Sequence, residues 1–326
     1  MALSLRRGRV TAVAERHPGL VRCEVDGEPC VAYPDLTGAV ALGDDVVVNE
    51  QARALGLGTG GFDVLHANLT RGLGLAPSPD AHVMKLPYTP VQFAARHVEE
   101  DGALADSLAG TPVVCCSLHS QVAPVAAALA GMRVAYMQLP GGALPLALSD
   151  TIRALRSRGL VAATATVGPC FGGDLECVTS ASALAWASAD HDVVVCAIGP
   201  GIVGTASRLG HGGLAAAEAA NVAAALDGLP VLAVRVSSGD ERERHRGVSH
   251  HSRAVVELCL GDVAIAWPLG LEAPEWLPRR QDVDVSEWQE ACEGLPLAHM
   301  ARGPADDPWF FASAFAAGKL ARGLVR

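Results

Sequence analysis

Two stretches of this sequence decide its fold: His191–Gly213, HDVVVCAIGPGIVGTASRLGHGG, and Leu229–Ser252, LPVLAVRVSSGDERERHRGVSHHS. Each begins with an apolar run of strand length and continues into a loop rich in glycine, serine, histidine and arginine. The alanine-rich segment between them has the length of a helix. A strand, a helix and a second strand in this order are typical of two parallel strands joined by a right-handed crossover.

The same alternation of apolar strands and helix-length segments runs through residues 111–326. It predicts an α/β fold with a doubly wound, mostly parallel sheet. Residues 1–68 contain short strands separated by turn signals, which predicts a small N-terminal β-barrel domain of the SH3-like or OB-like type. Residues 69–110 are interpreted as a connecting segment, with one helix that begins at Pro90 after the capping residue Thr89.

Composition and charge narrow the class of protein. The net charge of −10 and the pI of about 5.5 disfavour general affinity for nucleic acid or anionic membranes. No apolar run has the features of a signal peptide or a membrane span. The nine cysteines are odd in number and scattered, which predicts reduced thiols. We therefore expect a cytoplasmic protein.

In an open parallel sheet, ligands bind beyond the carboxyl ends of the strands, so a site is expected in the loops that follow them. The loop GPGIVGT places glycines directly after a strand, where backbone amides can approach an anion. It lacks the dinucleotide-binding fingerprint and the lysine of a P-loop, and a tight structural turn is the alternative interpretation. The substrate-binding residues predicted in this loop are Gly199, Gly201, Gly204 and Thr205.

The second loop, Asp240–Ser252, holds three of the eleven histidines within seven residues. Its arginines and serines suit a phosphate or carboxylate, and imidazoles can act as acid or base. We assign anion binding to Arg244, Arg246 and Ser249, and catalysis to His245, His250, His251 and Asp240. A hydrogen-bonded structural loop is one alternative. A metal site is the other, because two of the histidines are spaced like paired zinc ligands. The arginines would repel a cation, so no metal ligand is assigned.

Three further residues near the strand ends are assigned to substrate binding. Cys170 follows the third strand, where it would become a thiolate nucleophile if a helix end or His119 lowered its pKa. A small apolar cysteine before a turn is the alternative. His119 itself lies in the loop after the first strand of the sheet, and His211 lies directly before the alanine-rich helix.

The last predicted helix is marked by Asp307 as its cap and Pro308 at its first position. It carries four of the fourteen aromatic residues: Trp309, Phe310, Phe311 and Phe315. In an alanine-rich protein such a cluster fills the core or forms a contact in a homodimer, and the core is the favoured interpretation.

Three segments of the sequence, His82–Gln92, Gly199–Thr205 and Asp240–Ser252, resemble an uncharacterised bacterial family catalogued as a domain of unknown function, number 3866. The resemblance extends over nearly the whole chain. It implies no activity and no catalytic residues. It does imply that Lys85, Tyr88 and Gln92 belong with the site, whereas composition alone places them in the connecting segment, where they would pack the joint between the domains.

Together these features predict a cytoplasmic protein that binds a small anionic metabolite at the carboxyl edge of its sheet. Whether it also turns the metabolite over is left open, and no cofactor is assigned. One rival is a non-enzymatic binding or regulatory module whose barrel, with its early cluster of arginines, contacts RNA or a protein. The other is a metal-dependent hydrolase with histidine ligands.

Overall fold

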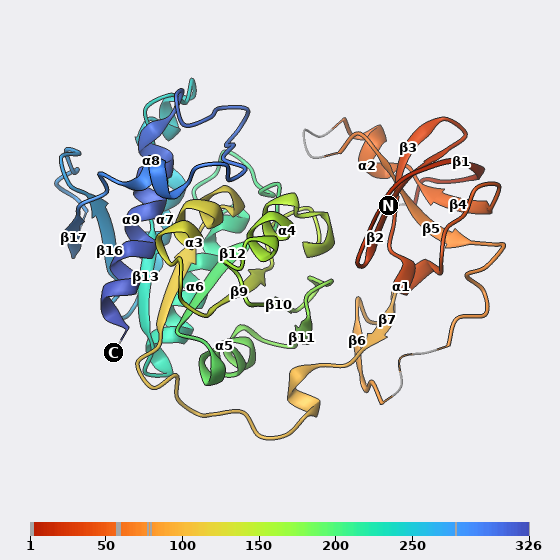
Figure 1. The fold of residues 1–326 in the computed structure, drawn as a ribbon, viewed down its shortest axis with the longest axis horizontal. Coiled ribbons are helices and arrows are strands. Elements are labelled where there is room, and N and C mark those ends of the chain that lie inside the picture. Colours follow the sequence, from red (N-terminus) through yellow and green to blue (C-terminus); the bar gives the residue numbers. More distant parts are fainter. Residues whose placement is uncertain (1–2, 57–59, 77, 79, 278, 326) are drawn as a thin grey trace. The chain divides into compact units, whose positions relative to one another are not determined.

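The structure, a computed structural model, describes residues 3–56, 60–76, 78, 80–277 and 279–325. The chain divides into two compact units, Met1–Arg96 and His97–Arg326 (Figure 1). Within the described ranges, none of the helices combines the length and the apolar character needed to cross a membrane.

The first unit contains a closed five-stranded β-barrel, as the turn-rich sequence predicts. The strands lie in the order β1-β2-β3-β5-β4 and are β1 (Leu5–His17), β2 (Leu20–Val25), β3 (Glu28–Ala32), β4 (Asp45–Asn49) and β5 (Asp63–Asn68). Two single-turn helices, α1 (Pro34–Thr37) and α2 (Gln51–Ala54), precede β4 and β5. Buried valines such as Val10, Val25 and Val46 fill the interior, because alternate residues of a strand point to the same face.

The arginines at the start of the barrel are balanced by carboxylates. Arg6 pairs with Asp26 at 2.9 Å and with the fully buried Asp63 at 2.7 Å. Arg7 pairs with Asp45 on the neighbouring strand β4. Nucleic-acid faces rely on cations that are free to neutralise phosphates, so these paired arginines give the RNA-binding alternative no support.

The prediction of a helix that begins at Pro90 is wrong. Phe93–Ala95 forms strand β7, which pairs antiparallel with strand β6 (Val83–Lys85). The hydroxyl of Thr89 donates to the carbonyl of Leu86 within the tight turn between them, instead of capping a helix. Pairing of β7 with β6 across the turn 86–92 has outweighed the helix signals at Thr89 and Pro90, because strand contacts can override helix propensity. A single 3-10 turn, η1 (Val98–Glu100), follows.

The second unit is built on an eight-stranded, all-parallel sheet in the order β11-β10-β9-β12-β8-β13-β16-β17, which confirms the predicted α/β class. Its strands are β8 (Pro112–Cys116), β9 (Val134–Leu139), β10 (Ala163–Val167), β11 (Leu175–Cys177), β12 (Val193–Ile198), β13 (Leu229–Ala233), β16 (Ala264–Pro268) and β17 (Arg280–Val283). The sequence did not predict the short edge strands β11 and β17. Strands β12 and β13 flank the central strand β8, so the loops that follow them emerge side by side at the carboxyl edge.

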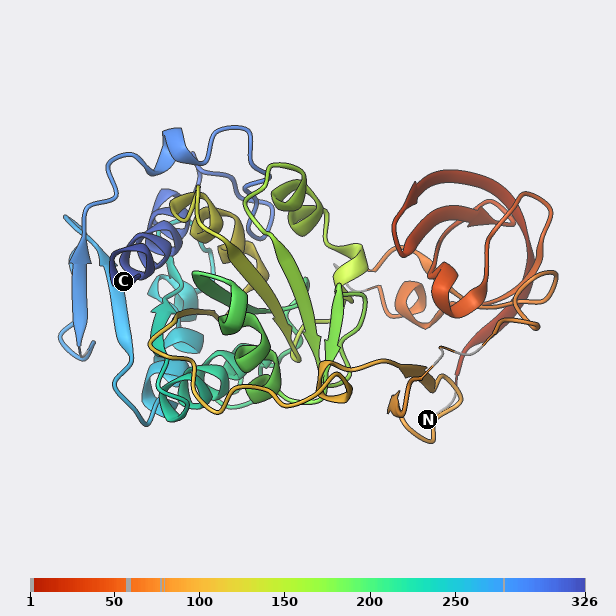
Figure 2. The same ribbon diagram turned by 60° about the horizontal axis from the view of Figure 1, so that its bottom comes forward.

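Helices cover both faces of this sheet (Figure 2). One face carries α3 (Val122–Ala128), α4 (Asp150–Ser157), α8 (Trp288–Ala291) and α9 (Pro308–Leu324); the other carries α5 (Ser180–Asp190), α6 (Ala215–Ala225) and α7 (His250–Leu258). Strand β8 shows why two layers form. Val114 and Cys116 enter the first core, and Val113 and Cys115 enter the second, because successive side chains alternate between faces.

The predicted last helix is confirmed as α9. Phe310, Phe311 and Phe315 are buried in the core beneath it, in agreement with the favoured interpretation of the aromatic cluster. Asp307 precedes the helix but does not cap it. Its carboxylate instead accepts hydrogen bonds from the Ser237 hydroxyl and the Ser238 amide, which ties the start of α9 to the loop after β13.

Candidate functional site

The loops after β12 and β13 meet at the carboxyl edge of the sheet. The first loop folds back on itself through a bridge between Gly204 and His211. The second loop forms a small antiparallel ribbon of β14 (Val236–Ser237) and β15 (Gly247–Val248) before α7 begins at His250. The ring of His211 stacks on the ring of His251, with centroids 3.8 Å apart. Residues that are forty positions apart in sequence therefore come into contact, as the sheet topology predicts.

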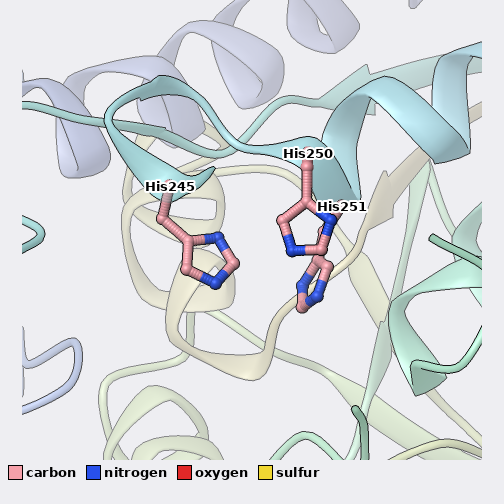
Figure 3. Close-up of side chains that lie close together, drawn as sticks. All are labelled: His245, His250 and His251. Atoms are coloured by element: carbon pink, nitrogen blue, oxygen red, sulfur yellow. The ribbon is translucent and has the colours of Figure 1, made fainter. Parts of the chain in front are cut away.

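Three histidines of the second loop cluster around a common space (Figure 3). His245 comes from the 3-10 turn η5 (Glu243–His245), and His250 and His251 open helix α7. The ring centroids of His245 and His250 lie 4.9 Å apart, and those of His250 and His251 lie 4.3 Å apart. His245 and His251 are buried and His250 is half-buried. The predicted catalytic histidines thus form one group.

The imidazoles of this group are held in the neutral form. Burial lowers the pKa of His245 to about 3, and the nearby guanidiniums of Arg235 and Arg242 lower it further. Burial likewise lowers the pKa of His251 to about 2, with the neighbouring histidines adding to the effect. The pKa of His250 is also lowered, first by burial and then by Arg244. Neutral imidazole has one donor nitrogen and one acceptor nitrogen, so each ring can either give or accept a hydrogen bond at neutral pH.

Ser249 orients this cluster. Its side-chain oxygen caps helix α7 by accepting from the amide of His251 at 3.2 Å. The same oxygen shares a hydrogen bond of 2.7 Å with Nδ1 of His245. Ser249 is fully buried. It was predicted to bind an anion directly, but the structure places it between two histidines, where it fixes the ring of His245.

A network of three arginines around one carboxylate lies beside the histidines. Oδ2 of Asp240 accepts hydrogen bonds from Arg235 and Arg242 at 2.8 Å each and from Arg302 at 3.0 Å. The bond from Arg242 is the main reason why the pKa of Asp240 lies well below its usual value. A carboxylate held in this way is occupied as an acceptor. The structure therefore places Asp240, a predicted catalytic residue, as the counter-ion of the arginines.

Arg235 is the member of the network that stands out, because its guanidinium is completely buried. It follows strand β13 and binds Asp240 through one nitrogen. Its Nε and its second terminal nitrogen, Nη1, are buried and have no hydrogen-bond partner among the residues that the structure describes. Burial lowers the pKa of Arg235 to about 10, so it still carries its charge at neutral pH. Native proteins rarely leave buried donors unpaired unless something else binds them.

The two arginines that were predicted to bind an anion are exposed at the rim of the site. Nε of Arg246 donates to the backbone carbonyl of Asp240 at 3.0 Å, which leaves its outer nitrogens toward solvent. Arg244 makes no hydrogen bond or ion pair with the described part of the chain, yet its charge is close enough to lower the pKa of His250. Arg244 is therefore available to an incoming anion.

The glycine-rich loop serves mainly for close packing of backbones. A Cβ atom added to Gly199 would meet the carbonyl oxygen of Leu144 and the side chain of Gln138. One added to Gly204 would lie 2.8 Å from Cβ of His211. Gly201 has a positive φ of 74°, and Thr205 is exposed and bonds to Gly210 within the loop. These residues shape the loop and hold His211 in place, and their predicted role in ligand binding stays a prediction.

His119 lies on the helical layer of α3 and α4, where both of its ring nitrogens are used. Nδ1 contacts the hydroxyl of Tyr136 at 3.2 Å, and Nε2 contacts the hydroxyl of Ser149, the cap of α4, at 2.8 Å. The residue is buried, and burial lowers its pKa to about 4. Its partners make it a structural link, although it was predicted to bind substrate.

We expect His119 to make folding stability depend on pH below 6.5. Its pKa is about 4 in the folded protein and about 6.5 in an unfolded chain, so the unfolded state takes up the proton first. Stability is then intact above pH 6.5 and falls by about 1.4 kcal/mol per pH unit down to pH 4. Urea unfolding at pH 7 and at pH 5 measures this. The loss over that range should be about 2 kcal/mol smaller in His119→Gln, and equal losses in the two proteins would contradict the assignment.

Three of the predicted residues lie away from the histidine cluster or in the other unit. Cys170 is partly exposed in the turn after β10. Lys85 and Tyr88 belong to the unit Met1–Arg96. Lys85 is buried at the end of β6, whereas Tyr88 is 91% exposed in the turn between β6 and β7. That these three residues share a site with the histidines stays a prediction.

Four residues in or beside the site were not assigned to it from the sequence: Arg235, Arg242, Arg302 and His299. Arg235 appears there as a single charge in the apolar run LPVLAVRV, and a charged residue at the end of a buried strand is a usable signal for a site. His299 stacks on Phe310 with ring centroids 3.9 Å apart, and its Nδ1 meets the hydroxyl of Ser120 at 3.0 Å. Nothing in the irregular segment around His299 points to this position.

The comparison with protein families matches residues 29–318 to the family described as "Protein of unknown function (DUF3866)". This range covers most of the chain and every residue of the histidine cluster. The chain belongs to this family. The resemblance seen in the sequence is thereby confirmed, and the matched range includes parts of both compact units. A search of curated proteins found no match. The description of DUF3866 carries no activity, so a functional proposal has to rest on the geometry of the site.

Proposed function

We propose that the protein binds a small anionic metabolite, bearing phosphate or carboxylate groups, at the carboxyl edge of its parallel sheet. The binding groups are the guanidiniums of Arg235 and Arg244 and the imidazoles of His245, His250 and His251. The neutral rings would exchange protons with the bound anion.

The observation that carries this proposal is the state of Arg235. A buried donor without an acceptor costs about 1–3 kcal/mol, and Arg235 has two such nitrogens. Three guanidiniums share the carboxylate of Asp240, and among the described residues only Arg302 has a second carboxylate partner, Asp307 at 3.3 Å. The region thus has an excess of positive charge and of unpaired donors. An anion supplies both the missing charge and the missing acceptors.

The imidazoles of the cluster add further hydrogen-bonding atoms beside the unpaired donors of Arg235. Nε2 of His250 and Nδ1 of His251 are buried atoms that find no hydrogen-bond partner in the described part of the chain. Both residues lie in the first turn of the nine-residue helix α7, whose positive end favours negative charge. An imidazole that contacts the anion is also in position to transfer a proton to or from it, which is the acid–base role predicted for these histidines.

The test is calorimetric titration of the protein with inorganic phosphate and with citrate at low ionic strength. Arg244→Gln removes a rim guanidinium that has no structural partner, and we expect it to weaken binding about tenfold, which corresponds to about 1.4 kcal/mol. Arg279→Gln removes an equally exposed arginine that is paired with Asp262 elsewhere on the surface, and should leave binding unchanged. Absence of binding, or equal effects of the two substitutions, would contradict the proposal.

A further inference from the structure

We propose that His245, His250 and His251 form a binding site for a divalent transition metal, with Zn²⁺ as the first candidate. One ring nitrogen from each residue lies within 4.8 Å of the other two, and Figure 3 shows the rings gathered around a common space. Across the described ranges, no other group of three histidine, cysteine or acidic side chains reaches this proximity. The inference goes beyond the proposed function, because a metal can bind here whether or not an anionic metabolite does.

Three imidazoles are a suitable set of donors for zinc. Catalytic zinc sites use three protein ligands and leave a fourth position open, and nitrogen is among the preferred donor atoms. Zinc–nitrogen bonds of about 2.0–2.1 Å place tetrahedral ligand atoms about 3.3 Å apart. The three nitrogens therefore have to approach one another by about 1.5 Å at most. His250 is half-buried, so rotation of its side chain can supply most of this movement.

The hydrogen bonds of the three rings leave ligand atoms available. His245 uses Nδ1 for the contact with Ser249, which leaves Nε2 for a metal and fixes the orientation of the ring, as outer partners of metal-bound histidines do. Nε2 of His250 and Nδ1 of His251 have no partner although they are buried. One metal ion would coordinate all of these nitrogens at once, whereas one hydrogen bond would engage only one of them.

The surrounding charge indicates what the open position holds. The guanidiniums of Arg235 and Arg242 converge on Asp240, so that carboxylate is not free to act as a further metal ligand. A bare cation next to these arginines would be repelled. A metal that carries hydroxide or a bound anion in its fourth position has a lower net charge and gives the arginines a negative partner. We therefore infer a site that binds metal and anion as neighbours.

The experiment uses the full chain without an affinity tag, treated with EDTA and then titrated with ZnCl₂ by calorimetry. A second titration with Co²⁺ is followed by visible absorption, because tetrahedral Co²⁺ absorbs far more strongly than hydrated Co²⁺. We expect one Zn²⁺ per chain and the tetrahedral Co²⁺ signal. His250→Ala, and His250→Asn measured in parallel to keep a polar residue at the start of α7, should lose both.

His191→Ala is the matched control, because His191 is a partly buried histidine directly before β12, at the amino end of the sheet. It should bind both metals as the wild type does. Failure of the wild type to take up zinc, or equal binding by the His250 and His191 variants, would overturn the inference. Phosphate titrated into metal-free and zinc-loaded protein separates the two proposals. Phosphate binding without zinc uptake overturns only the metal site, and zinc uptake without phosphate binding to either form overturns only the proposed function.

Discussion

Asp240→Asn should destabilise the protein by about 3–5 kcal/mol. The substitution keeps the shape of the side chain and removes the charge that Arg235, Arg242 and Arg302 share. Arg235 is completely buried, and a buried charge left without its counter-ion is far more costly than the loss of an exposed ion pair. Urea denaturation followed by circular dichroism measures the change in the unfolding midpoint.

Asp262→Asn provides the comparison. Asp262 pairs with Arg279 at 3.0 Å but is fully exposed, and exposed ion pairs contribute little to stability. We expect its unfolding midpoint to match that of the wild type. An Asp240→Asn protein that is as stable as Asp262→Asn would mean that the three arginines do not need this carboxylate as a counter-ion. It would also contradict the proposal that Arg235 needs an anion as a partner.

The sequence predicted the fold class well because strand and helix signals there are periodic and repeated. Runs such as PVVCC and VVVCAI are apolar on both faces, which is typical of strands covered by two helical layers, and the structure has them as β8 and β12. The predicted helix at Pro90 failed for the opposite reason. Its signals, Thr89 and Pro90, are two single residues, and both lie in the turn that joins β6 to β7.

The site was predicted in part. The cluster of His245, His250 and His251 follows from the composition of a single loop at the carboxyl edge. The separate roles of Ser249 and Asp240 do not, because they depend on which neighbours reach those side chains in space. For the glycine loop, ligand contact and a tight structural turn were both left open, and the close approach of neighbouring segments to Gly199 and Gly204 agrees with the turn.

The central claim is that the histidine cluster binds a ligand and does not stabilise the fold. His251→Leu tests it, because leucine has a similar volume and no polar atoms. Nδ1 of His251 is buried without a partner, and an unpaired buried polar atom costs about 1–3 kcal/mol. Functional sites commonly carry such a cost, and replacing their polar groups tends to raise stability while function is lost.

The measurement is thermal unfolding of the wild type and of His251→Leu, each with and without saturating phosphate. We predict that His251→Leu melts above the wild type when phosphate is absent. Phosphate should raise the melting temperature of the wild type, since a ligand that binds only the folded state stabilises it, and should leave that of His251→Leu unchanged. A variant that melts below the wild type and keeps the full phosphate response would contradict the account.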